Sequence, residues 1–345
     1  MPDFFYLPRR NMKRQGWLIH KIASMENLQL AYYKAQRGKM KKAEVQVFGR
    51  RLQSSLRELQ QQILSGEVEA GGYHYFTIYE PKQRMICSAP FSQRVLHHAL
   101  MNICHPFFDR QQVAGSFASR TGKGTCAALD RARYYHRRYA WFLKLDVRKY
   151  FDSIDHDILK EQLFRLFKDV QLLRILAKII DSYAVVSGKG VPIGNLTSQY
   201  FANHYLSSVD HRMFEVLHLP GYVRYMDDMV LWDDNQERLL HAGRELEFQA
   251  KTNLKLSLKP FCLNRCDKGM PFLGYLLYPD CVRLSQRSRR RFVAKADIYA
   301  KRLMSGEWSQ HEYATHVRPL ESFTEYAEST AFRRSVYCRI DAFSA

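Results

Sequence analysis

The chain alternates between two hydrophobic patterns, one with the period of a strand and one with the period of a helix. Two runs, 221–232 and 139–146, are apolar and rich in β-branched and aromatic residues, which predicts strands. In the first run the apolar arms flank Met226, Asp227 and Asp228. We therefore predict a tight β-hairpin with these three residues at or next to its turn.

The remaining chain mixes both patterns, which predicts an α+β fold. Shorter alternating runs predict further strands over 73–79, 84–87, 254–259 and 271–278. Helical spacing predicts helices over 45–64, 126–136, 155–166, 172–186 and 237–252, another that begins at Arg94, and a basic one from 285 onward. In one stretch Phe201, Tyr205, Val209 and Met213 recur every four residues, which predicts a long helix through Met213.

Composition narrows the choice of partner. The 345 residues are 46% hydrophobic, enough for a sizeable core, and 53 Lys and Arg face 34 Asp and Glu, a net charge of +19. That excess favours a polyanionic partner, nucleic acid first and an anionic membrane surface second. No run approaches the roughly 18 apolar residues of a membrane span. Seven scattered Cys without a Cys-x-x-Cys motif indicate reduced thiols, so we expect a soluble cytoplasmic protein.

The adjacent acids of the predicted hairpin are its candidate chemistry. Asp227 and Asp228 repel each other unless cations share the site. Two divalent metal ions about 3.5–4 Å apart would remove that repulsion and form the centre of an in-line phosphoryl displacement. The alternative is a solvated acidic turn, but the apolar arms are unusual for a surface turn.

A third carboxylate ends the other apolar strand. Asp146 follows 139–145 directly, and a carboxylate at a buried strand end is costly unless it is paired or bound to a metal. It would supply the third ligand beside Asp227 and Asp228. The alternative role, capping of the following turn, suits Asp152 or Asp155 better.

Several basic or glycine-rich segments could meet phosphates. The loop 116–125 is not a Walker A motif, because Gly122-Lys123 is followed by Gly124, yet its amides and basic side chains suit a nucleic-acid backbone. A basic hairpin over 73–87 could cover a triphosphate, or be an exposed turn with incidental charge. The glycine-rich loop 187–199 permits close approach by a ligand or base pair.

In this order, the stretches over roughly 73–280 resemble the sequence blocks of reverse transcriptases. The resemblance implies that Asp146, Asp227 and Asp228 are catalytic and bind two Mg²⁺ ions, together with the backbone of Val147. It implies that an RNA template, an RNA/cDNA duplex and dNTPs are the partners, with no membrane. Lys259 becomes the candidate acid that protonates pyrophosphate, with Lys268 as its competitor.

The same resemblance assigns further site residues. The implied nucleotide-binding residues are Lys82, Arg84, Lys149, Tyr150, Phe151, Ile193, Gly194 and Lys259. Phe151 falls where the family keeps a bulky steric gate against ribonucleotides. The implied nucleic-acid-binding residues are Arg120, Lys123, Ser198, Gln199, Gly274, Tyr275, Arg289, Arg290 and Arg291.

The implied architecture is a right-hand polymerase fold with fingers, a palm whose antiparallel sheet carries helices on one face, and a short helical thumb. We expect its parts to be a basic helical N-terminal extension (1–70), fingers (71–140), palm with the first aspartate (141–185), a fingers/palm loop (186–200), palm with the hairpin and primer grip (201–284) and a short basic thumb (285–345).

One departure points to a subfamily. Many reverse transcriptases carry Gln-Gly-x-x-x-Ser-Pro in the loop, where this chain has Ile193-Gly194-Asn-Leu-Thr-Ser198-Gln199. That form, with the 120–125 loop and Ile154-Asp-His156, resembles the reverse transcriptases of diversity-generating retroelements. The resemblance implies error-prone copying at adenines of a structured template-repeat RNA, a small basic oligomeric accessory variability determinant protein, and a bacterial or phage origin.

Two rival hypotheses remain open at this point. A retron-like or phage-defence reverse transcriptase is equally compact. A nucleic-acid-binding scaffold that has lost catalysis is the alternative from another class, and the intact Asp146, Asp227 and Asp228 weigh against it. The segment 285–345 is shorter than the splicing domain of a group II intron maturase, so we do not expect a full maturase.

Overall fold

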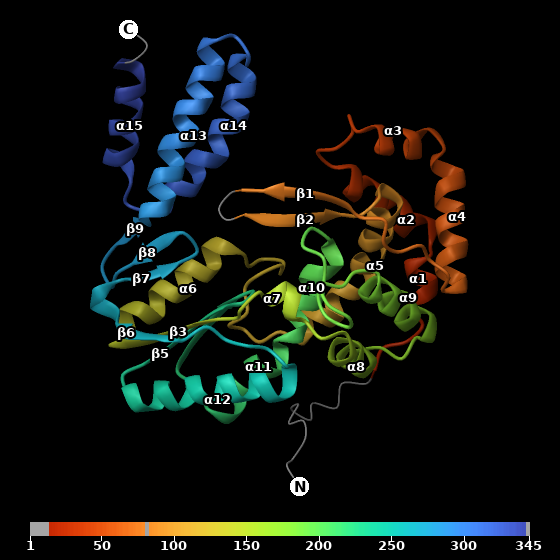
Figure 1. The fold of residues 1–345 in the computed structure, drawn as a ribbon, viewed down its shortest axis with the longest axis horizontal. Helices are drawn as coiled ribbons and strands as arrows, with labels where there is room; N and C mark the ends of the chain where they lie inside the picture. Colours follow the sequence, from red (N-terminus) through yellow and green to blue (C-terminus); the bar gives the residue numbers. More distant parts are fainter. Residues whose placement is uncertain (1–13, 80–82, 343–345) are drawn as a thin grey trace.

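The computed structural model describes residues 14–79 and 83–342, with the side chains of 341 and 342 left out. Lys82, a predicted nucleotide-binding residue, lies outside the described residues. A central sheet occupies the lower left of Figure 1, a mostly helical N-terminal part lies to its right, and three C-terminal helices rise at the upper left. This mixed arrangement of helices and sheets confirms the predicted α+β class.

The central sheet is antiparallel, in the order β4-β5-β3-β6. Its strands are β4 (Gly221–Tyr225), β5 (Asp228–Asp233), β3 (Trp141–Asp146) and β6 (Cys262–Arg265). The hairpin predicted over 221–232 is thereby confirmed. Alternate side chains enter two cores, since Leu143 and Leu231 pack into one and Phe142 and Val230 into the other.

Different elements cover the two faces of this sheet (Figure 1). On one side lies α12 (Gln236–Leu254), which contacts β3 and β5. On the other side α6 (Thr125–Arg138) contacts β4 and β5. A second sheet joins α6 in the same core; its strands are β7 (Met270–Phe272), β8 (Tyr275–Leu277) and β9 (Val282–Leu284). Helices therefore lie on both faces of this sheet, whereas we predicted them on one face.

The N-terminal helices surround one long helix and share its core. That helix is α5 (Phe91–Arg110), which packs against α1 (Ile19–Ile22), α2 (Met25–Gln36) and α3 (Ala43–Arg50). The last of the set is α4 (Leu52–Ser65), which contacts α9 (Val170–Asp181) and ends at the left-handed Gly66. The hairpin of β1 (His74–Ile78) and β2 (Arg84–Ser88) projects from this part towards the centre of the molecule (Figure 1).

The chain crosses from β3 to β4 through five α-helices and a π-helical turn. These elements are α7 (Tyr150–Ser153), α8 (His156–Leu166), α10 (Leu196–Tyr205), α11 (Ser207–His211) and the π-helix Arg212–Val216, with α9 between α8 and α10. Asp155 caps α8 by accepting from the amides of Asp157 and Ile158, so one of the capping roles considered above is observed.

The C-terminal helices are α13 (Gln286–Met304), α14 (Gln310–Glu325) and α15 (Thr330–Ala342). They share a small core that contains Phe292, Leu320 and Val336. A capping box between Ser309 and Glu312 starts α14.

Five predicted elements differ in the structure. The helix predicted over 45–64 is two helices, α3 and α4, which meet at Arg51. The segment 271–278 is a hairpin rather than one strand, because Leu273 and Gly274 both have positive φ, as a two-residue hairpin turn requires. The segment 254–259 is not a strand: Lys255 is left-handed, and residues 257–259 form an isolated bridge with 146–148. The helix predicted to run through Met213 breaks after Tyr205, and the one predicted over 172–186 ends at Asp181.

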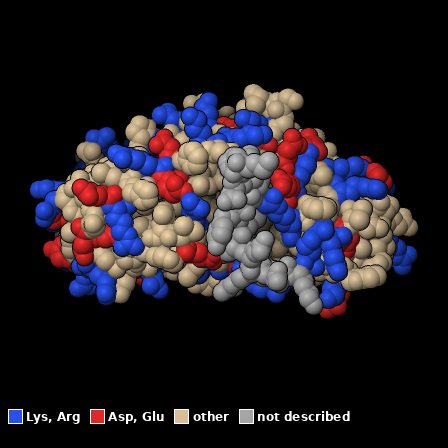
Figure 2. Space-filling model, turned by 90° about the horizontal axis from the view of Figure 1, so that it is seen from below, with Lys and Arg blue, Asp and Glu red and all other residues tan. Residues whose placement is uncertain are grey.

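Where the structure describes it, the face opposite the C-terminal helices has no region of a single sign of charge. Figure 2 shows Lys and Arg interleaved with Asp and Glu over this face, where α12 lies. Among the described residues, none of the helices combines the length and the apolar character that a bilayer crossing needs.

Candidate active site

Three carboxylates meet at one end of the central sheet. Asp146 and Asp228 face each other across the β3–β5 register, and Asp227 lies in the two-residue turn between β4 and β5. The preceding turn residue, Met226, has φ 55°, a left-handed conformation that costs about 1–3 kcal/mol for a side chain of this kind. The turn is held in this shape because its arms are locked in the sheet.

The environment disfavours charge on the hairpin carboxylates. Burial, followed by the negative charge of Asp146, raises the pKa of Asp227 above its usual value. Burial also raises the pKa of Asp228, and both neighbouring carboxylates add to the rise, while Lys144 opposes it. The structure thus brings like charges together at a partly desolvated place, the condition that a bound cation would relieve.

Two lysines hold two of these carboxylates. Lys259 Nζ lies 2.5 Å from Asp146 Oδ2, and its amide donates to the carbonyl of Asp146 at 2.9 Å. Lys144 Nζ lies 3.0 Å from Asp228 Oδ1 and donates to the carbonyl of Pro271 at 2.8 Å. Sequence reasoning missed Lys144, although its place two residues before Asp146 puts it on the same face of the strand.

The position of the competing lysine follows from the register of β6. Cys262 pairs with Lys144, and Arg265 pairs with Trp141 at the opposite end of β3 from Asp146. Lys268 follows Arg265 and lies beyond that far end. Of the two lysines considered for one role, Lys259 is therefore the one beside the carboxylates.

The donors fit a hard divalent cation in chemistry. Carboxylate and carbonyl oxygens are the ligands that Mg²⁺ prefers, and Asp146, Asp227 and Asp228 supply the first kind. Across 14–79 and 83–342, no three His, Cys, Asp or Glu side chains already stand in the arrangement of a metal site. In this structure Asp228 and Asp146 are instead paired with Lys144 and Lys259.

A loop and a hairpin close one side of the carboxylate cluster. Arg84 begins β2, and its charge lowers the pKa of Asp227 against the larger effect of burial. The carbonyl of Ile193 accepts from the amide of Cys87 at 2.8 Å, so the loop before α10 is bonded to β2. Gly194 has φ 125°, and a Cβ there would lie 2.8 Å from the Cys87 carbonyl oxygen. Only glycine fits this close approach.

The residues after Asp146 turn away from the strand. Lys149 is exposed and left-handed, with φ 43°. Tyr150 is buried, and its hydroxyl donates to the carbonyl of Ala202 in α10. Phe151 is half-buried against the larger core, and its carbonyl accepts from the amide of Val191. This short helix therefore links the carboxylate strand to the glycine-rich loop.

Comparison with known proteins decides the family. Residues 79–277, more than half of the chain, match the family model described as "Reverse transcriptase (RNA-dependent DNA polymerase)". The chain belongs to the reverse transcriptase family. The match spans all three carboxylates and the hairpin that carries two of them.

The similar proteins are distant. "Nuclear intron maturase 1, mitochondrial" of Arabidopsis thaliana is 27% identical over 112 residues, which are 29% of this chain and 16% of the maturase. "Protein YkfC" of Escherichia coli K12 is 23% identical over 269 residues, 63% of this chain and 70% of YkfC. The solved apo telomerase of Candida tropicalis covers 66% of this chain and 52% of its own, at 12% identity and a TM-score of 0.48. The match to this chain spans only about a sixth of the length of the intron maturase, and about a sixth of a second intron protein.

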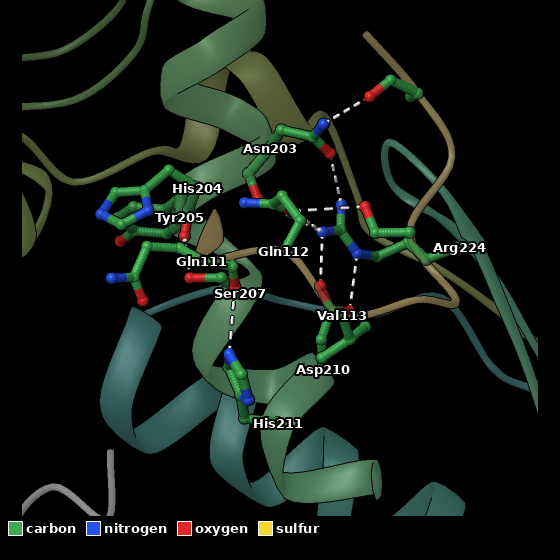
Figure 3. A network of polar contacts seen from close by, with 12 residues as sticks. Gln111, Gln112, Val113, Asn203, His204, Tyr205, Ser207, Asp210, His211 and Arg224 are labelled. Atoms are coloured by element: carbon green, nitrogen blue, oxygen red, sulfur yellow. Dashed lines mark hydrogen bonds and ion pairs between the residues drawn. The ribbon is translucent and has the colours of Figure 1, made fainter. Parts of the chain in front are cut away.

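A buried ion pair supports the hairpin of this reverse transcriptase. Arg224 in β4 is 0% exposed and points towards Asp210 and Asn203 (Figure 3). It donates to Asp210 Oδ1 at 2.7 Å, to Asn203 Oδ1 at 2.9 Å and to Gln112 Oε1 at 3.1 Å. It also donates to the carbonyl of Met226 at 3.1 Å, inside the turn itself.

The charge state of this pair follows from its contacts. Burial opposes charge on Arg224, but the Asp210 carboxylate outweighs burial and raises the pKa of Arg224 above its usual value. Tyr222 adds a hydrogen bond to Asp210 Oδ1 at 2.6 Å. Sequence reasoning missed this network; an arginine inside an otherwise apolar strand was the available signal.

The predicted nucleic-acid contacts differ in their exposure and in their partners. Arg120 pairs with Asp109 at 2.7 Å, and Lys123 donates to the carbonyl of Ala114. Burial lowers the pKa of Lys123 to about 8. Ser198 is only 2% exposed.

The remaining predicted contacts divide between surface and interior. Gln199 is exposed and accepts from Ser119 at 3.2 Å. Gly274 forms the β7–β8 turn, and the adjoining Tyr275 is 3% exposed, with its hydroxyl bonded to the Phe323 carbonyl. The buried Tyr275 thus connects the second sheet to α14. On α13, Arg290 is exposed, while Arg289 and Arg291 lie over the rings of Phe332 and Phe323 at 4.7 and 5.4 Å.

Proposed function

We propose that this reverse transcriptase is an active RNA-directed DNA polymerase that uses Asp146, Asp227 and Asp228 for nucleotidyl transfer. The observation that carries the proposal is the register in which Asp146 faces Asp228 with Asp227 in the adjoining turn. A solvated acidic turn needs no third carboxylate and no burial. A scaffold without catalysis has no need for groups whose pKa values burial raises.

In this proposal the three aspartates, with the backbone carbonyl of Val147, hold two Mg²⁺ ions. When bound, the ions activate the primer 3′-hydroxyl and stabilise the leaving pyrophosphate. To bind the ions, Asp228 and Asp146 would exchange their present lysine partners, Lys144 and Lys259, for the metal. Lys259 is the candidate proton donor to pyrophosphate, since its Nζ already lies at the carboxylates and that of Lys268 does not.

The protein side chains around this centre bind and orient the nucleotide. Arg84 begins β2, its charge acts on Asp227, and its guanidinium is proposed to bind the triphosphate together with the exposed Lys149. Phe151 is proposed as the steric gate that excludes a 2′-hydroxyl and so selects dNTPs. The loop at Ile193 and Gly194 is proposed to contact the nascent base pair, since it lies against the strand that begins at Arg84.

The finer proposal is that the protein copies a template-repeat RNA with errors at adenines, as part of a diversity-generating retroelement, with a basic accessory protein in a bacterial or phage cytoplasm. Its support is the Ile193 form of the loop. Glutamine at that place can hydrogen-bond near the incoming nucleotide, whereas isoleucine offers only apolar contact. Ile193→Gln is expected to lower misincorporation opposite adenine, and unchanged error rates would refute the role of Ile193.

The test is primer extension with Mg²⁺ on an adenine-rich RNA template, followed by sequencing of the cDNA. The control is Asp227→Asn/Asp228→Asn, which keeps shape and removes the charges. Extension by the wild type alone, with errors opposite adenine, supports both levels of the proposal. Accurate extension supports the polymerase proposal, contradicts the error-prone one, and favours the retron-like or defence alternative. No extension, with or without an added accessory protein, would favour the scaffold.

A further inference from the structure

One side of α6 carries a surface that the active site does not use. Ala128, Leu129, Ala132 and His136 form the buried side, which packs onto the sheet face that also carries Asp146 and Asp228. The opposite side is turned towards solvent. β3 begins at Trp141, just after α6, and its length carries the chain about 17 Å to Asp146. The outer side of α6 is thus separate from the carboxylate cluster.

The outer side is strongly basic and not neutralised. Arg131, Arg133, Arg137 and Arg138 lie within two turns of helix. In the described part of the chain, no carboxylate lies within ion-pair distance of these guanidiniums. The neighbouring acid, Asp130, accepts from the hydroxyl of Tyr326 at 2.7 Å. This differs from the α12 face, where both signs of charge interleave (Figure 2).

An exposed aromatic ring stands among these arginines. Tyr134 is 51% exposed, the Arg131 guanidinium lies 5.8 Å from its ring centre, and Arg138 donates to its hydroxyl at 3.4 Å. A cavity of about 440 Å³ opens here, and its lining residues are Asp130, Arg133, Tyr134, Arg137 and Arg138. Arg133 Nε is buried and has no hydrogen-bond partner among the described residues.

We propose that this surface, the 131–138 face of α6, binds an unpaired stretch of RNA outside the active site. Arg133 and Arg137 are four residues apart, about 6 Å along the helix, which suits successive phosphates of one strand. Tyr134 stands between them as a stacking platform for a base. A duplex offers its bases no such contact, because they are stacked inside. The inference deepens the proposed function, on which it depends for the identity of RNA as template.

The experiment measures binding of the full-length protein to two fluorescent primer–RNA duplexes by anisotropy. One duplex is blunt, and the other carries a 12-nucleotide single-stranded RNA extension, tested at either end in turn. The variants are Arg133→Gln/Arg137→Gln, Tyr134→Ala and Tyr134→Phe. The matched control, Arg244→Gln/Lys251→Gln, removes two exposed charges from α12.

We expect the wild type to bind the extended duplex more tightly than the blunt one. Arg133→Gln/Arg137→Gln is expected to bind the extended duplex about tenfold more weakly than the wild type. The slope of log affinity against log salt concentration is expected to become shallower by about 1.4, because two phosphate contacts are lost. Tyr134→Ala is expected to lose a similar factor, about tenfold, because it removes the ring on which a base would stack. Tyr134→Phe, which keeps the ring, and the α12 control are expected to match the wild type.

The inference is overturned if Arg133→Gln/Arg137→Gln and Tyr134→Ala still bind the extended duplex more tightly than the blunt one by the wild-type factor. It is also overturned if the α12 control loses as much affinity as these variants, or if these variants lose as much affinity for the blunt duplex. Polyglutamate binding is measured on the same variants. If the α6 substitutions weaken binding to polyglutamate but not to RNA, the partner is an acidic polypeptide and the inference is overturned. Primer extension on the same duplexes separates the two proposals. Absent synthesis with an intact, α6-dependent gain defeats the polymerase alone, and synthesis without such a gain defeats the α6 surface alone.

Discussion

The guanidinium of Arg224 donates to both carboxylate oxygens of Asp210, at 2.7 and 2.5 Å, and neither side chain is exposed. The same guanidinium holds the carbonyl of Met226, one residue before Asp227. The ion pair therefore adds to the sheet pairing in holding the hairpin turn, from within the core. An apolar pair of similar volume would fill the space but would not hold this carbonyl.

Arg224→Met is expected to destabilise the protein by about 3–5 kcal/mol, because it leaves the Asp210 carboxylate buried and unpaired. Urea unfolding at neutral pH measures the change. Tyr222→Phe is the matched control; it removes one hydrogen bond from Asp210 and is expected to cost about 1 kcal/mol. Equal losses from the two substitutions would contradict the dominant role of the ion pair.

Asp227→Asn and Asp228→Asn are each expected to stabilise the metal-free protein while abolishing synthesis. Their pKa values are raised in the folded state, so the ionised carboxylates cost stability above the unfolded-state pKa, and that cost disappears as pH falls through the folded-state pKa. At pH 7 each variant should melt roughly 2 °C higher than the wild type. Added Mg²⁺ should raise the melting temperature of the wild type alone, and a lower melting temperature for both variants without metal would contradict the argument.

Lys144→Met is expected to move the acid limb of the pH–activity profile to higher pH. Lys144 opposes the rise in the pKa of Asp228, so its loss leaves that carboxyl protonated at a higher pH. Lys144→Arg keeps the charge and should retain the wild-type profile. Initial rates of primer extension between pH 5 and pH 8 make the comparison, and an acid limb that does not move in Lys144→Met would show that Lys144 acts through packing alone.

The parts of the site that follow from local sequence were predictable. The apolar arms around Met226 and the strand before Asp146 set the hairpin and its neighbour, and the observed register brings the carboxylates together. The partners supplied by distant segments were not predictable. The charge on Arg224 is matched by an aspartate in another element, and nothing in the spacing of either residue indicates that they meet.

Hydrophobic alternation alone also failed to distinguish strands from other extended chain. Leu254, Leu256 and Leu258 alternate with exposed residues and are buried as predicted, yet the segment is not a strand. Left-handed Lys255 ends α12 and redirects the chain towards Asp146. Periodicity reports burial, whereas strand pairing also needs a partner with free backbone groups.

Gly194→Ala is expected to destabilise the loop before α10 and to weaken nucleotide binding. The added Cβ would lie 2.8 Å from the Cys87 carbonyl oxygen, at a φ of 125° that side chains rarely adopt, so the loop must move away from β2. A loss of about 1–3 kcal/mol in urea unfolding and a higher KM for dNTP are expected. Gly188→Ala is the control, since Gly188 also has positive φ, 73°, but a Cβ there meets no atom within 4 Å. Because only Gly194 is in close contact with β2, an equal rise in KM for both variants would show that backbone strain, rather than this contact, positions the loop.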